Sequence, residues 1–134
     1  MTKNIEEKNP ELTAISTHTM NPNCLDQPCP IEIALDIIGG KWKGVILYRL
    51  LGGTKRFNEL QKLCKNITQR TLTLQLRSLE SDGLVQRTVY AEVPPRVEYT
   101  LTPLGASMEP IIQALFEWGI AYKQTIKGQS LSEK

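Results

Sequence analysis

Residues 68–101 read TQRTLTLQLRSLESDGLVQRTVYAEVPPRVEYTL. The first half of this stretch predicts a helix over about 68–82, because three leucines recur at the spacing of one helix face. Thr68 is suited to the N-cap, since its hydroxyl can accept a hydrogen bond from an unpaired amide of the first turn. Gly83 supplies the C-terminal stop. The helix therefore has an apolar face made of Leu72, Leu76 and Leu79.

The outer face of this helix is polar and basic. At about 100° per residue, two arginines fall opposite the leucines and are flanked by threonines. The residues of this outer face are Gln69, Arg70, Thr71, Thr73, Leu74, Arg77 and Ser78. Such a helix packs its leucines inward and presents hydrogen-bonding side chains outward.

The second half of the stretch predicts two strands. Residues 84–91 and 96–101 are rich in Val, Tyr and Thr with partial alternation. Glu92-Val93-Pro94-Pro95 separates them as a stiff loop. We therefore expect a hairpin directly after the polar-faced helix.

A long helix is predicted after the hairpin, and Thr102-Pro103 marks its start. Pro110 should bend this helix, because proline removes a backbone donor and crowds the preceding turn. One stripe of the helix is apolar and contains Leu104, Met108, Ile111, Ile112, Leu115, Trp118 and Tyr122.

Three shorter helices are predicted upstream, joined by glycine-bearing or asparagine-bearing turns. Pro30 is suited to the first position of the first helix, and Gly39-Gly40 ends it. The second helix spans 42–51, and the third begins near Phe57. Cys64 shares a face with the third helix's core residues, so we expect it in the core. The three apolar faces contain Ile31, Ala34, Leu35 and Ile38; Val45, Ile46, Leu47 and Leu50; and Phe57, Leu60, Leu63 and Cys64.

This order of elements is the layout of a winged helix-turn-helix, a mainly α fold with a small β-hairpin (α+β). With 134 residues the chain has room for one domain with a real core. We place that domain at 28–126, after a polar N-terminal extension at 1–27 and before a polar tail at 127–134.

Charge is distributed unevenly along the chain, although the net charge is only +2. Residues 41–100 carry 11 basic against 5 acidic side chains, whereas residues 1–40 carry 2 against 6. A basic segment is typical of a phosphate-binding face, but a solvated surface gives the same pattern. The sequence contains no apolar run near the ~20 residues of a membrane span and no secretory leader, so we expect a cytoplasmic protein.

The fourth helix of a winged helix-turn-helix can lie in the major groove of double-stranded DNA, with the hairpin as a wing. We expect base contacts from Gln69, Arg70, Thr71 and Thr73, and we include the N-cap Thr68 among the DNA-binding residues. We expect contacts to the backbone or minor groove from Lys55, Arg56, Arg77, Arg87 and Arg96.

Two other functions are alternatives to DNA binding. A protein-docking winged helix would have an apolar outer face on the fourth helix, which Leu74 favours and Arg70 and Arg77 oppose. An enzyme has little support, because no phosphate-cradling glycine loop, paired-histidine motif or nucleophile elbow is found. No cofactor is expected, and a metal site of His18, Cys24 and Cys29 is only thinly supported.

The final helix also bears on assembly. A helix of about 20 residues is ~30 Å long, and its apolar stripe is too long for one small core to cover. Pairing with the same helix, and with the first helix, of a second copy would bury it in a homodimer. The alternative is a helix packed wholly within its own domain. A two-fold dimer predicts a pseudo-palindromic operator with half-sites about one turn apart.

Several distinctive sequence blocks lie along the chain. They are Cys29-Pro30, Ile37 to Trp42, Arg56 to Leu60, Leu72 to Val85, Tyr90, Pro94 to Tyr99, Leu101 to Gly105, and Trp118-Gly119. Together these blocks closely resemble the HxlR-type transcriptional regulators. The resemblance covers about residues 24–122 and implies a dimeric winged-helix repressor or activator related to the MarR group. Residues 1–23 fall outside it.

The thiols suggest how such a regulator is controlled. Cys29 precedes Pro30 at a helix start, where unpaired amides favour an anion, while the charge of Glu32 opposes this. The resemblance implies that the cysteine of this Cys-Pro pair senses oxidants, quinones or aldehydes. Cys24 is a candidate resolving partner, unless both thiols are merely exposed. A small ligand at the dimer interface is the alternative signal.

Overall fold

The computed structural model describes residues 20–23, 25 and 27–132, and the chain divides into two compact units, 1–40 and 41–134. The first unit contains α3 (Pro30–Ile38), which confirms the first predicted helix. Pro30 begins α3, and the Ile33 amide donates to the Cys29 carbonyl oxygen at 3.2 Å. None of the side chains of α3 is buried.

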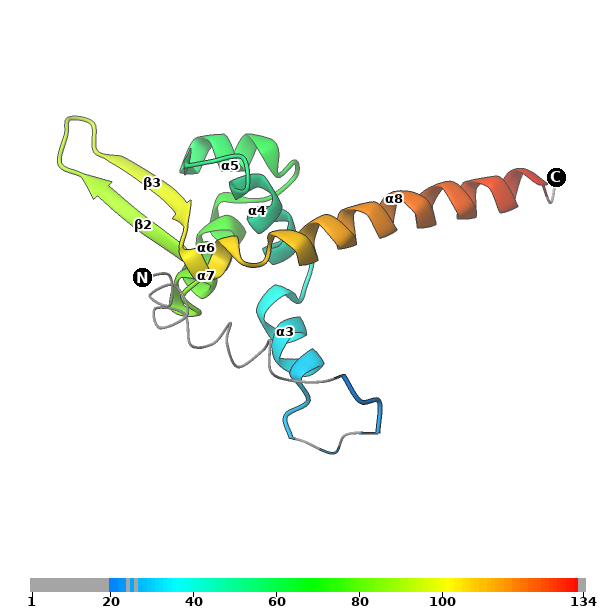
Figure 1. Cartoon of the computed structure of the whole chain (residues 1–134). Helices are drawn as coiled ribbons and strands as arrows, with labels where there is room; N and C mark the ends of the chain where they lie inside the picture. The colour runs from blue at the N-terminus through cyan, green and yellow to red at the C-terminus, as the bar shows by residue number, and fades with distance from the viewer. Residues whose placement is uncertain (1–19, 24, 26, 133–134) are drawn as a thin grey trace, which may run out of the picture. The chain divides into compact units, whose positions relative to one another are not determined.

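The second unit is built around three helices, α4 (Lys43–Leu50), α5 (Phe57–Leu63) and α6 (Gln69–Ser81), shown in Figure 1. Their predicted apolar faces meet in a common core, although Leu63 remains exposed at its edge. The core side chains from these helices and the turns after α5 are Ile46, Leu47, Leu50, Leu60, Cys64, Ile67, Leu72, Leu76 and Leu79.

Both ends of α6 form as the sequence predicts. The Thr68 hydroxyl accepts a hydrogen bond from the Thr71 amide at 3.0 Å, which satisfies one of the unpaired donors of the first turn. Gly83, with φ of +83°, follows the helix in the left-handed region that glycine adopts most readily. The polar-faced helix is therefore held between a side-chain cap and a glycine stop.

A three-stranded antiparallel sheet packs beside these helices, with the strand order β1-β3-β2. The predicted hairpin is confirmed as β2 (Val85–Tyr90) and β3 (Arg96–Leu101). The third strand, β1 (Lys55–Arg56), was not predicted, because two residues are too short to show an alternation. In β1, Lys55 lies opposite Tyr99 and Arg56 lies opposite Glu98.

The C-terminal part differs from the prediction of one helix bent at Pro110, which was wrong. The chain instead forms a short helix, α7 (Pro103–Ala106), and then α8 (Glu109–Ser132). Pro110 lies in the first turn of α8, where its missing amide is not needed. Breaking the helix at Ser107-Met108 thus avoids the clash that a proline causes inside a helix. α8 also continues through residues 127–132 of the expected tail.

Gly105 allows α7 to approach the start of the hairpin. A Cβ at this position would lie 2.1 Å from the Leu84 carbonyl oxygen, so any larger residue would push the two backbones apart. The Thr102 hydroxyl, which caps α7, also donates to the Gly83 carbonyl oxygen at 2.6 Å. These contacts fix the end of the sheet against the end of α6.

Among the described residues, none of the helices combines the length and the apolar character that a membrane-spanning helix needs.

Candidate nucleic-acid interface

The outer face of α6 has exposed side chains in its first turn and again further along the helix. Gln69 and Arg70 are exposed in the first turn, and Arg77 is exposed two turns later. Leu74, between the two arginines, is 52% exposed. The face therefore presents two guanidinium groups and an amide around one apolar side chain.

The threonines on this face are engaged within α6 itself. The Thr73 hydroxyl donates to the Gln69 carbonyl oxygen at 2.9 Å. The Thr68 hydroxyl donates to the Thr71 hydroxyl at 2.9 Å, in addition to accepting from the Thr71 amide. Thr71 and Thr73 are also half-buried. Of the four residues expected to read bases, Gln69 and Arg70 are the best placed to do so, because both are exposed.

A groove of about 410 Å³ lies between α6 and the sheet. It brings Gln69, Thr73 and Arg77 of α6 together with Arg87 of β2, and its lining mixes these polar groups with apolar ones. The lining residues are Phe57, Gln69, Thr73, Leu76, Arg77, Glu80, Arg87, Val97 and Tyr99. Predicted site residues from two separate elements thus meet in one concave surface, whereas Arg70 and Arg96 do not line it.

Lys55 and Arg56 lie in β1, at the edge of the sheet, rather than in a free loop before α5. The Lys55 ammonium donates to the Gly53 carbonyl oxygen at 3.3 Å, and its side chain is half-buried. The Arg56 amide donates to a Glu59 carboxylate oxygen at 2.7 Å, which caps α5, while the Arg56 side chain stays exposed. Arg56 is therefore the more accessible of the two cations.

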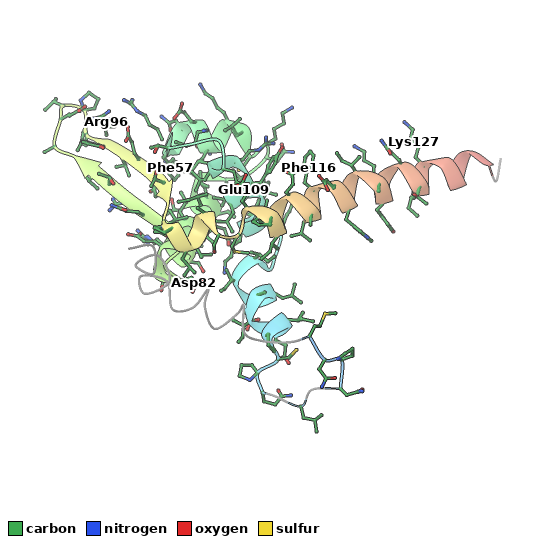
Figure 2. All side chains as sticks on the ribbon, in the orientation of Figure 1. Phe57, Asp82, Arg96, Glu109, Phe116 and Lys127 are labelled. Carbon is green, nitrogen blue, oxygen red and sulfur yellow. The ribbon has the colours of Figure 1, made fainter. Side chains whose placement is uncertain are left out.

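Arg96 is enclosed near the tip of the wing (Figure 2). Its guanidinium contacts the Glu92 carboxylate at 3.0 Å and the Glu98 carboxylate at 3.2 Å. It also lies over the Tyr90 ring, 3.9 Å from the ring centre. Tyr90, Glu92 and Glu98 were not predicted as partners of Arg96, because the register of β2 against β3 and the fold of the loop bring them together.

The two described cysteines lie in different environments. Cys29 is a free, half-buried thiol at the N-cap of α3. Cys64 is 1% exposed, which confirms it as a core residue, and burial raises the pKa of its thiol against a smaller opposing effect of the Arg49 charge. His18 and Cys24 lie outside the described residues, and within those residues no three metal-binding side chains come together.

The first part of the long helix α8 contacts α4. Ile112 is buried, and the Phe116 ring stacks on the Tyr48 ring of α4 with centres 5.1 Å apart. A second stripe, turned by about 100° from these two residues, stays exposed. It consists of Ile111, Leu115, Trp118, Tyr122 and Ile126. The later turns of α8 extend beyond the α4 contact in Figure 2.

The sequence model of the HxlR-like helix-turn-helix family matches residues 37–127, from the end of α3 through most of α8. The chain belongs to the HxlR-like helix-turn-helix family. Over 98 residues this HxlR-like chain is 59% identical to the uncharacterized HTH-type transcriptional regulator YdeP of Bacillus subtilis (strain 168). That match spans 73% of this chain and 77% of YdeP.

Solved structures of similar proteins have the same fold. The redox regulator HypR in its reduced form matches the HxlR-like chain with a TM-score of 0.71 and 52% identity, over 75% of this chain and 99% of HypR. A MarR-family putative regulator from Porphyromonas gingivalis W83 matches with a TM-score of 0.68 and 34% identity, over 77% of this chain and 97% of its own. The winged-helix fold is thereby confirmed, and the chain is a transcriptional regulator of the helix-turn-helix type.

Proposed function

We propose that this regulator works as a homodimer that binds a pseudo-palindromic DNA operator in the cytoplasm. α6 of each copy enters the major groove, and the β2–β3 wing follows the adjacent backbone. One observation carries the proposal most strongly: the exposed face of α6 and the wing join at a groove that gathers Gln69, Arg77 and Arg87. Such a concave basic surface suits a phosphate backbone on either side of a groove-bound helix.

Within this arrangement, Gln69 and Arg70 read bases, because they are the exposed side chains of the first turn of α6. Arginine donates two hydrogen bonds to guanine O6 and N7, and glutamine pairs with adenine N6 and N7. Arg77, Arg87 and Arg56 neutralise phosphates. The Thr71 hydroxyl accepts from Thr68 and keeps its own proton for a base acceptor, whereas the Thr73 hydroxyl donates to the Gln69 carbonyl oxygen and can only accept from a base.

The second copy is inferred from exposed apolar surface. The stripe formed by Ile111, Leu115, Trp118, Tyr122 and Ile126 faces away from the core, and large exposed apolar patches mark interaction sites. α3 likewise buries none of its side chains. In a two-fold dimer, the exposed stripe of α8 and the surface of α3 would be covered by the corresponding helices of the partner.

Selection from a pool of random DNA duplexes tests the DNA-binding proposal. The wild-type chain is expected to enrich a palindrome whose half-sites lie about 10–10.5 base pairs apart. Arg70→Ala should lose discrimination at one position in each half-site, by about 1–3 kcal/mol, because a bidentate base contact disappears. Lys123→Ala, at an exposed position on α8, is the control. Identical base preferences for Arg70→Ala and the wild type would overturn the role given to Arg70.

We further propose that oxidation at Cys29 controls DNA binding. Support comes from its free, half-buried thiol at a helix start and from the similarity to HypR, which is described as a redox regulator in both reduced and oxidized forms. A disulfide between Cys29 and Cys24, within or between subunits, is the product expected. In forming it, two thiols pass two electrons and two protons to the oxidant.

Non-reducing gels and DNA-binding titrations, before and after treatment with diamide, test this control. The wild type should form a disulfide-linked species and change its affinity for the selected operator, and reductant should reverse both. Cys29→Ser should show neither change, and Cys24→Ser tests the resolving partner. If Cys29→Ser responded to diamide as the wild type does, Cys29 would not be the controlling thiol. No response in the wild type would end the thiol proposal and favour a ligand at the dimer interface.

A further inference from the structure

Arg96 is the first residue of β3 and lies directly opposite Tyr90, the last residue of β2. This cross-strand pairing places the guanidinium over the Tyr90 ring, 3.9 Å from its centre. A cation over the face of an aromatic ring is attracted by the negative charge of that face. The contact therefore joins the two strands at the point where they leave the sheet.

Two carboxylates complete the enclosure of Arg96. Nη2 contacts Glu92 in the loop between the strands at 3.0 Å, and Nη1 contacts Glu98 on β3 at 3.2 Å. The Arg96 side chain is only 28% exposed, and its Nε atom is fully shielded from solvent. The loop, the end of β2 and the start of β3 are thus held by one side chain, which we call the Arg96 clamp.

The charge of the Arg96 clamp is unfavourable for a phosphate. Two carboxylates surround one guanidinium, so the cluster has a net charge of −1, and a phosphate can reach Arg96 only by displacing a carboxylate. Arg87 differs from Arg96 in its exposure, its surroundings and its ion pairing. It is exposed, lines the groove beside α6, and forms no ion pair within the described part of the chain.

We infer that Arg96 is a positioning residue that holds the wing in shape, and that Arg87 is the wing cation that contacts a DNA phosphate. The first half of this inference concerns the free protein alone, whereas the second rests on the proposed DNA binding. It reverses the assignment of Arg96 to backbone or minor-groove contact that the sequence suggested.

Amide hydrogen exchange of the free protein tests the clamp. Arg96→Gln should accelerate exchange severalfold in residues 89–98, because the wing tip opens more often without its clamp. Arg96→Lys keeps the charge and should restore part of the protection, and Arg87→Gln, the matched control on the same hairpin, should leave exchange at the tip unchanged. Wild-type exchange rates in Arg96→Gln would overturn the positioning role, whether or not the protein binds DNA.

The salt dependence of binding to the selected operator tests the division of roles. Arg87→Gln should reduce the slope of log K against log salt by about 0.9 per subunit, as expected for one lost phosphate contact. Arg96→Gln should leave the slope unchanged. A reduced slope in Arg96→Gln, or an unchanged one in Arg87→Gln, would contradict the inference.

A double change of the acids gives a readout that a purely structural role would not move. In Glu92→Gln with Glu98→Gln, Arg96 keeps its charge but loses both partners, so the slope should increase by up to about 0.9 per subunit. The increase should be absent when Arg96→Gln is added, which separates a freed guanidinium from the general effect of removing two acids. Equal slopes in the double and triple variants would exclude Arg96 as the source.

Discussion

Cys64 lies at the end of α5 among the leucines of the core, and its thiol is almost fully shielded. Burial disfavours the thiolate, so the pKa of the Cys64 thiol is raised above its ordinary value of 9.0. The folded protein therefore holds the Cys64 proton to higher pH than the unfolded chain does. The neutral thiol therefore contributes to the free energy of unfolding below the ordinary pKa of 9.0, and this contribution is lost as pH rises through the pKa of the folded protein.

The free energy of unfolding should consequently fall as pH increases above about 9, with part of the fall caused by Cys64. Urea denaturation at a series of pH values measures it, in reductant so that disulfides do not form. Cys64→Ala is expected to be less stable at pH 7 because it leaves a small cavity, yet to lose stability less steeply between pH 8 and 10. The same slope in both proteins would show that Cys64 does not titrate in this way.

Arg96 and Thr73 show why single residues of the site were harder to predict than the fold. The sequence identifies each as a hydrogen-bonding side chain on an exposed element, which is correct. Their partners depend on folded geometry: the register of β2 against β3 places Tyr90 opposite Arg96, and the helix backbone offers Thr73 a carbonyl oxygen. An exposed donor in the sequence is therefore only a candidate for contact with a partner molecule.

At the scale of elements, α6 and the hairpin could be predicted because their signals are local. Thr68, the three leucines and Gly83 determine α6 within one stretch of chain, and each forms the contact expected of it. β1 could not be predicted, since it exists only where residues 55–56 meet β3. The break between α7 and α8 was misjudged because Pro110 permits either a kinked helix or a restart.

The exposed stripe on α8 leads to a prediction about assembly. Trp118 is 67% exposed and stacks on Tyr122, so a glutamate at this position would place a charge at the centre of the proposed interface. Trp118→Glu should weaken the dimer by at least about 2 kcal/mol, or about thirtyfold in Kd, measured by sedimentation over a range of concentrations.

Gln124→Glu adds the same charge on the opposite side of α8 and serves as the control. It should leave the dimer Kd unchanged. If both variants dimerised as the wild type does, the interface would have to lie away from the exposed stripe, and α3 would become the next region to change.

The whole molecule joins a winged helix to a positive charge that is concentrated between residues 41 and 100. The leading segment has an excess of acidic side chains, so the basic surface arises from the second unit alone. Under the proposed function, such a surface supplies binding energy to any DNA, and the exposed first turn of α6 supplies the choice among sequences.

Dimethyl sulfate footprinting on the selected operator tests whether two copies of α6 occupy the major groove, because the reagent methylates guanine there. The account predicts two protected patches about one helical turn apart, bound by two copies of the chain and both weakened by Arg70→Ala. A single protected patch, protection confined to the minor groove, or two patches that Arg70→Ala leaves unchanged would contradict it.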